Sequence, residues 1–157
     1  MTANRHAGRW RRRLRRVVAG LRTGLGPLAA NTTPPMSDDH PYEISWIEPG
    51  SLAERLEQAA APVIVDVRGA DEFDGALGHL ADARNIALAE LPGRIVELAR
   101  YQDRDLVLVC HTQMRSAQAA RLFDSAGFRN VAVLRGGMVE WRQRGLPVAG
   151  PGPASGA

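Results

Sequence analysis

The sequence predicts an open parallel α/β sheet with helices on both faces. From about residue 43 onward, segments of strand composition alternate with segments of helical periodicity. Residues 63–67 and 106–109 are near-continuous apolar runs rich in valine, typical of strands that are buried on both faces of a parallel sheet. Parallel strands need crossover connections, and the helical segments between the runs supply them.

The first predicted elements are a short strand and a helix. Residues 43–47 can form the strand. Ser51 and Glu54 stand at the Ser-x-x-Glu spacing of a capping box, which predicts that a helix begins there. The expected buried face of this helix consists of Leu52, Leu56 and Ala59. The strand at 63–67 follows and is closed by charged residues.

The same alternation continues to the end of the domain. A second helix is indicated by the spacing of Leu91, Ile95 and Leu98, and the strand at 106–109 follows it. A third helix should end at Gly127, and its expected buried positions are Ala119, Leu122, Phe123 and Ala126. The last strand, 131–134, leads to Gly136, Gly137 and a short helix that carries Met138 and Trp141.

Charge divides the chain into a basic end and an acidic remainder. Residues 1–35 contain 8 arginines and no Asp or Glu, whereas residues 36–157 contain 12 arginines against 17 acids, a net charge of −5. The basic isoelectric point therefore belongs to the first segment, and we expect no nucleic-acid partner. We expect a basic tail and linker at 1–41, one α/β domain at 42–149 and a flexible C-terminus at 150–157.

The basic tail admits several interpretations. Its apolar residues and arginines fall on different faces of a helical pattern up to residue 25, and glycines and prolines follow as a linker. A weak membrane-surface contact, a targeting peptide and a nucleic-acid contact stay open, as do a disordered tail and a true start at Met36. No apolar run is long enough to cross a bilayer.

The chain has one cysteine, Cys110, which excludes an intramolecular disulfide and a Cys-based zinc site. The four histidines show no clustered ligand spacing. We therefore expect no metal, no cofactor and a reducing, cytoplasmic location.

Cys110 directly follows the strand 106–109, at the carboxyl end where open parallel sheets bind ligands. The four residues His111, Thr112, Gln113 and Met114 separate it from Arg115, and a helix is expected to begin near Ser116. Such a loop directs backbone N–H groups and a helix dipole toward its centre, which favours an anion and stabilises a thiolate. Arg115 adds a planar cationic donor for an anionic substrate. The sequence predicts an activated thiol that engages small anions; a buried structural cysteine is the alternative.

Between residues 63 and 148 the chain resembles the rhodanese family. The matching positions occur in the family's order and spacing: Val63 to Arg68 with its closing Asp-Val-Arg, Glu72-Phe73, Gly78-His79-Leu80, Ala83, Asn85-Ile86, Val109-Cys110 with Arg115-Ser116, Gly127-Phe128, Val131, Leu134, Gly136-Gly137, Trp141 and Gly145 to Val148. The resemblance implies a five-stranded parallel sheet and a sulfurtransferase.

The resemblance also implies a two-step reaction. Cys110 would take a sulfane sulfur from a small donor, such as thiosulfate or a persulfide, and would become a Cys persulfide. The persulfide would then pass sulfur to cyanide, to glutathione or to a protein thiol. The loop from His111 through Thr112, Gln113 and Met114 to Ser116 would hold the persulfide and the donor, with help from Arg115.

Other matching positions are expected to serve the scaffold. Asp66, Arg68 and Glu72 should form an ion-pair network behind the loop, with substrate contact by Arg68 as the functional alternative. His79 is expected in a structural turn and Trp141 in the core. His111 could tune the thiol or could be an exposed loop residue.

One departure from the family concerns the loop itself. The family's common loop is Cys-x-x-Gly-x-Arg, and this chain has Gln113 in place of the glycine. Gln113 could strain the loop, re-aim one amide or place its side-chain amide in the pocket, which would alter the donor preference. Related phosphatases and arsenate reductases use the longer Cys-x5-Arg loop, so the spacing here favours sulfur chemistry. A non-catalytic binding or regulatory module is the other alternative, and retention of Cys110 argues against it.

Overall fold

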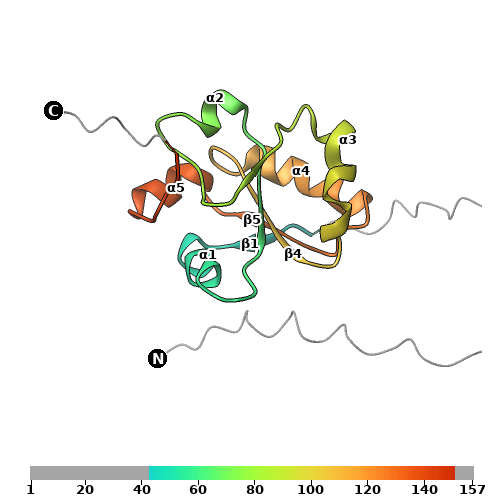
Figure 1. Ribbon diagram of the computed structural model, residues 1–157, viewed down its shortest axis with the longest axis horizontal. Coiled ribbons are helices and arrows are strands. Elements are labelled where there is room, and N and C mark those ends of the chain that lie inside the picture. Colours follow the sequence, from blue (N-terminus) through green and yellow to red (C-terminus); the bar gives the residue numbers. More distant parts are fainter. Residues whose placement is uncertain (1–42, 151–157) are drawn as a thin grey trace, which may run out of the picture. The chain divides into compact units, whose positions relative to one another are not determined.

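The computed structural model describes residues 43–150, so the predictions for the tail at 1–41 and for most of 150–157 lie outside the described residues. One five-stranded sheet has the order β1-β5-β4-β2-β3, and all its pairings are parallel (Figure 1). The strands are Ser45–Ile47 (β1), Val63–Asp66 (β2), Arg84–Asn85 (β3), Asp105–Val109 (β4) and Asn130–Leu134 (β5). The helices are Pro49–Leu56 (α1), Ala70–Phe73 (α2), Leu91–Arg94 (α3), the 3₁₀ helix Ile95–Tyr101 (η1), Met114–Ser125 (α4) and Gly137–Gln143 (α5). The predicted fold class is confirmed.

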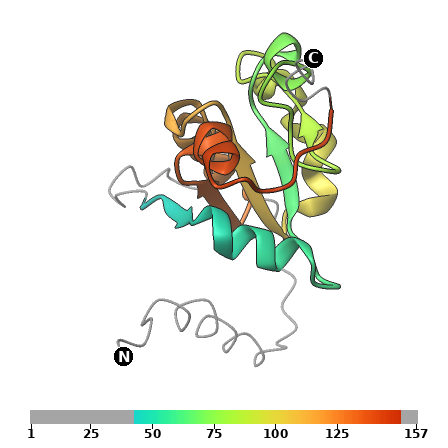
Figure 2. The same cartoon turned by 90° about the vertical axis from the view of Figure 1, so that its left-hand side faces the viewer.

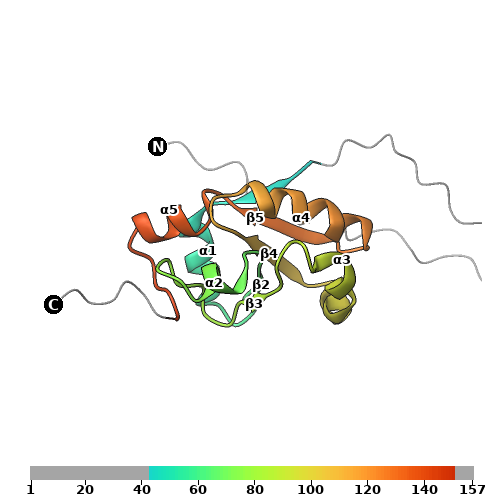
Figure 3. The same cartoon turned by 90° about the horizontal axis from the view of Figure 1, so that it is seen from above.

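Alternate residues of the central strands face two separate apolar cores. Leu106 and Leu108 of β4 pack with side chains of α3, η1 and α4 on one face. Val107 and Val109 pack with side chains of α1 and α5 on the other face. Figure 2 shows α1 in teal and α5 in red close together, and Figure 3 separates this pair from α3 and α4. Burial on both faces explains why β4 is an uninterrupted apolar run.

Helix α1 begins earlier than predicted. Pro49 is its first residue, and no side chain caps its N-terminus. The prediction of a capping box that starts the helix at Ser51 is therefore wrong. Proline suits this position because its fixed φ is already helical and its missing N–H would have no partner in the first turn. The helix ends at Leu56, and Ala59 lies beyond it, exposed rather than on the buried face.

The segment from Leu91 to Tyr101 is helical, as predicted, but only its first turn is α-helix. The remainder is a 3₁₀ helix, and spacings of three or four residues between apolar positions do not distinguish the two forms. Leu91 and Leu98 are buried as expected, whereas Ile95 is only partly buried.

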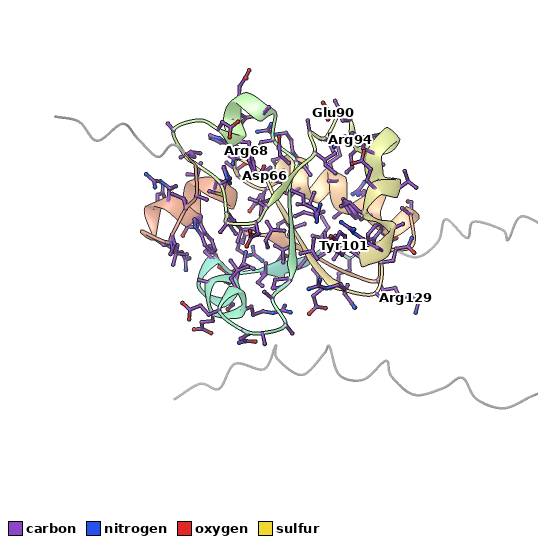
Figure 4. The ribbon with its side chains drawn as sticks, in the orientation of Figure 1. Asp66, Arg68, Glu90, Arg94, Tyr101 and Arg129 are labelled. Atoms are coloured by element: carbon purple, nitrogen blue, oxygen red, sulfur yellow. The ribbon has the colours of Figure 1, made fainter. Side chains whose placement is uncertain are left out.

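A buried ion pair fixes the end of β2. Arg68 donates from Nε and Nη2 to the Asp66 carboxylate, with the shortest bond at 2.7 Å, and both side chains are fully buried. Arg68 also donates to the carbonyl oxygens of Glu72 at 3.0 Å and Gly78 at 2.8 Å. Figure 4 shows Asp66 and Arg68 directed toward each other. Arg68 has no exposed surface, so it ties β2 to α2 and the following turn and does not line a substrate site.

Two further expectations about scaffold residues are confirmed. The His79 Nδ1 atom lies 2.9 Å from the carbonyl oxygen of Phe73, and the two rings stack with centroids 3.7 Å apart. Trp141 is 2% exposed, and its Nε1 donates to the carbonyl oxygen of Pro147 at 2.8 Å. None of the helices in residues 43–150 is long and apolar enough to span a membrane.

Candidate active site

Cys110 directly follows the carboxyl end of strand β4, and residues 111–113 link it to α4. The residue is 1% exposed and belongs to the core between the sheet and α4. Its Sγ accepts a hydrogen bond from the backbone N–H of Ser116 at 3.4 Å. The strand, loop and helix are therefore arranged as predicted, although α4 begins at Met114, two residues before the expected start.

The loop presents several backbone amides that have no acceptor in the described part of the chain. The first hydrogen bond of α4 runs from Ala117 N–H to Gln113 O at 2.9 Å. The amides of residues 111–115 donate to no acceptor among the described residues. Helix α4 is 12 residues long, and the positive end of its dipole lies at these amides. The arrangement favours negative charge on and beside Sγ.

The carbonyl groups of the loop face α5. Cys110 O accepts from Met138 N–H at 2.9 Å, and His111 O accepts from Val139 N–H at 3.0 Å. In a trans peptide the N–H and C=O groups point in opposite directions, so the amides of His111 and Thr112 point away from α5. A Cβ on Gly137 would lie 2.1 Å from Thr112 O, and φ at Gly137 is +56°. Only glycine allows α5 to approach the loop this closely.

Gln113 ties the loop to the start of α5. Its Oε1 accepts a hydrogen bond from Gly136 N–H at 3.1 Å. Its φ of −162° lies outside the left-handed region, so Gln113 does not adopt the backbone conformation that would favour glycine. Where the related loop has glycine, this chain therefore has a side chain that fastens the loop from outside.

Removing the Gln113 acceptor should weaken the fold slightly. We expect Gln113→Met to lower the free energy of unfolding by about 1 kcal/mol, because the half-buried Gly136 N–H loses its partner while side-chain volume is nearly kept. Gln113→Glu keeps an acceptor oxygen and should stay closer to the parent. Urea titration of both variants measures the difference, and equal stability of the methionine variant and the parent would refute this role.

Arg115 and Glu72 form a two-point ion pair beside the loop. Nη1 of Arg115 lies 2.6 Å from Oε2 of Glu72, and Nη2 lies 2.7 Å from Oε1. The hydrogen bond from Arg115 holds the pKa of Glu72 below its usual value, and the same bond raises the pKa of Arg115. The expected Asp66, Arg68 and Glu72 network is thus only partly correct. Arg68 reaches the Glu72 carbonyl, and the Glu72 carboxylate turns to Arg115 because Asp66 already occupies Arg68.

The Glu72–Arg115 pair predicts a pH-dependent contribution to stability. The folded-state pKa of Glu72 is lowered, so the contribution is present above the ordinary carboxylate range and is lost as pH falls through the folded-state pKa. Glu72→Gln should destabilise the protein at pH 7 by at most about 1 kcal/mol, because both side chains are more than one-third exposed. In urea titrations the difference from the parent should begin to shrink below about pH 4 and should vanish once the pH is below the folded-state pKa of Glu72. A difference of the same size at pH 3 would show that charge pairing is not the cause.

The remaining predicted substrate-binding residues lie around the mouth of the loop. His111, Thr112 and Met114 are exposed, and the His111 Nδ1 is 3.7 Å from Oε1 of Glu72. Ser116 is buried, and its Oγ has no hydrogen-bond partner in the described part of the chain. A groove of about 610 Å³ adjoins Arg115 and is lined mainly by apolar residues that include Val67, Leu88 and Leu122. Substrate binding by these loop residues stays a prediction.

No metal-ligand cluster of three or more His, Cys, Asp or Glu residues occurs within residues 43–150. The residues around the loop bring together the Cys110 thiol, backbone N–H groups and the Arg115 guanidinium.

The chain is similar to known proteins in sequence and in fold. The Rhodanese-like domain pattern matches residues 48–144. A sulfurtransferase of Allochromatium vinosum is 33% identical over 108 residues, which cover 69% of this chain and 97% of that protein. The putative sulfurtransferase YtwF of Bacillus subtilis is 30% identical over 67% of this chain and 97% of its own length. A rhodanese-related crystal structure from Thermoplasma volcanium has a TM-score of 0.59 at 28% identity, over 67% of this chain and 97% of that one.

The fold and the cysteine loop define a small domain of the sulfurtransferase class. The chain belongs to the rhodanese-like domain family.

Proposed function

We propose that the protein moves a sulfane sulfur from a small donor, such as thiosulfate, to a thiol or cyanide through a persulfide on Cys110. The observation that carries the proposal is the contact of Sγ with Ser116 N–H, next to the amides of residues 111–115, which have no acceptor among residues 43–150. Family membership and the sulfurtransferases among the relatives support the class of reaction. A single thiol in the chain suits a reducing cytoplasm, where we expect the protein to act.

In the first step the Cys110 thiolate attacks the outer sulfur of thiosulfate. The S–S bond of thiosulfate breaks, its electron pair leaves with sulfite, and Cys110 keeps the transferred sulfur as a persulfide anion. The amides of residues 111–115 and the N-terminus of α4 stabilise the charge on the donor and on the persulfide. The Ser116 hydroxyl is buried and has no hydrogen-bond partner within residues 43–150, so it is free to donate to this charge.

In the second step an acceptor attacks the terminal sulfur of the persulfide. A thiolate becomes a persulfide and cyanide becomes thiocyanate, and in both cases the electron pair of the broken S–S bond returns to Cys110 as thiolate. The apolar groove beside Arg115 has more room than an inorganic anion needs, which favours an organic thiol as acceptor.

The deep position of Cys110 restricts what can react. Because the residue is 1% exposed, only a small or slender group reaches Sγ, and the exposed His111 and Thr112 flank the approach. Arg115 already gives two N–H groups to Glu72, so its remaining N–H groups are those available to a donor anion.

The proposal is tested by a single turnover without acceptor. Mixing full-length protein with thiosulfate should release up to one sulfite per chain and then stop, and glutathione or cyanide should restart release. The surface variant Arg121→Gln serves as a control and should behave like the parent. No sulfite from thiosulfate, with loading from mercaptopyruvate or an organic persulfide, would assign a different donor. No loading from any donor would favour the non-catalytic binding module.

A further inference from the structure

A second cluster of charged side chains lies around Tyr101, the last residue of η1. Arg84 begins β3, and Arg104 directly precedes β4, whose carboxyl end is followed by Cys110. Together with Arg100 these arginines surround Tyr101, and their guanidinium carbons lie 5.1, 6.0 and 4.9 Å from the ring centroid. In the view of Figure 4, Tyr101 lies apart from Asp66 and Arg68. We call Arg84, Arg100, Tyr101 and Arg104 the Tyr101 patch.

The arginines of the Tyr101 patch have no carboxylate partners among residues 43–150. Arg84 donates from Nη2 to the hydroxyl of Tyr101 at 2.6 Å, and Arg104 donates to the carbonyl oxygen of Ala61 at 3.0 Å. The neighbouring carboxylates are engaged elsewhere, because Asp103 pairs with Arg129 and Asp105 pairs with Arg55. The patch is therefore an uncompensated positive area on a part of the chain, residues 36–157, whose net charge is −5.

This arrangement favours an anionic partner. Three guanidinium groups centred on one ring lie within about one Debye length of each other at moderate salt, roughly 10 Å, so they repel. An anion placed among them relieves that repulsion. The ring also restrains the arginines through cation–π contacts, which reduces the entropy that binding would otherwise cost.

We propose that the Tyr101 patch binds an acidic segment of a partner protein. Its three arginines are exposed and long, which suits an extended peptide better than a small molecule, since small-molecule sites are concave. Planar guanidinium groups match carboxylates in pairs of hydrogen bonds. A nucleic acid would continue past the patch over an acidic domain, which disfavours it. Tyr101 and Arg104 precede the amino end of β4, whereas Cys110 follows its carboxyl end, so docking around Tyr101 leaves the Cys110 loop free to exchange sulfur.

A localised signal is needed to test the proposal, because the arginines of residues 1–35 would also attract an acidic peptide. NMR cross-peaks of arginine Nε–Hε groups in the full-length chain, titrated with a peptide of eight glutamates, provide it. We expect saturable shifts at Arg84, Arg100 and Arg104 that weaken with salt, and little shift at the exposed Arg121.

A matched pair of variants adds a second measurement. The double variant Arg100→Gln/Arg104→Gln should weaken binding of the peptide, measured at the Arg84 signal, at least about threefold. The control Arg121→Gln/Arg142→Gln has the same charge change and should leave this binding unchanged. Equal shifts at all exposed arginines, or equal effects of the two double variants, would show that the peptide is attracted to positive charge in general and not to the Tyr101 patch. Either result would overturn the proposal. If a single-stranded nucleic acid of eight nucleotides bound the patch with higher affinity than the peptide does, the proposed class of partner would be overturned.

Discussion

Replacing Cys110 with serine should lower kcat/KM for sulfur transfer by at least about a thousandfold while leaving the fold in place. A hydroxyl is a much weaker nucleophile toward sulfane sulfur than a thiolate and cannot store sulfur as a persulfide. The chain has no second cysteine that could take over the role. The rate is measured with thiosulfate and either glutathione or cyanide, and circular dichroism checks the fold.

Two comparisons make this result specific to the thiol. Cys110 is buried, so serine places a hydroxyl in the core, and Cys110→Ala distinguishes that cost from the loss of the nucleophile. Both variants should be inactive, with the alanine variant free of the buried hydroxyl. Activity within tenfold of the parent in either variant would mean that sulfur is not carried on Cys110.

Replacing Arg68 with alanine should have the largest effect on stability, a loss of about 3–5 kcal/mol. The change leaves the Asp66 carboxylate buried without its cation and removes a donor from the carbonyl groups of Glu72 and Gly78. Small domains have only about 5–15 kcal/mol of total stability, so much of the variant should be unfolded at 37 °C. Urea titration measures the loss.

The double variant Asp66→Leu/Arg68→Met distinguishes the cost of leaving Asp66 buried without a cation from the loss of the ion pair itself. Replacing both charges with apolar groups avoids an isolated buried charge and should recover part of the lost stability. A loss below about 1 kcal/mol for Arg68→Ala would contradict the assignment of this pair to the scaffold.

Local patterns predict the sheet because strands buried on both faces appear in the sequence as continuous apolar runs. The valine-rich runs of β2 and β4 identify two parallel strands, and their alternate residues do face separate cores. Strand β3 shows no such run because two residues carry no periodicity, so a fifth strand follows only from the family resemblance. Competing start signals explain the error at α1, where Pro49 begins the helix ahead of Ser51.

The site likewise has features that neighbouring residues predict and contacts that join residues far apart in the sequence. Position after a strand, loop length and the following helix point to Cys110, and each lies within a few residues of it. The Arg115–Glu72 pair joins residues 43 apart, and the Gln113–Gly136 bond joins residues 23 apart. No periodicity encodes such pairings, so the fastening of the loop from α2 and α5 becomes visible only in the structure.

The most direct test of sulfur transfer through Cys110 is the intact mass of the full-length protein after exposure to a sulfane donor and removal of the excess. We expect a gain of one sulfur atom, about 32 Da, that maps to Cys110 and is reversed by cyanide or a thiol. Cys110→Ala should gain nothing under the same conditions. An unchanged mass with thiosulfate, mercaptopyruvate and an organic persulfide alike, or a gain that persists in the alanine variant, would contradict a sulfur relay through Cys110.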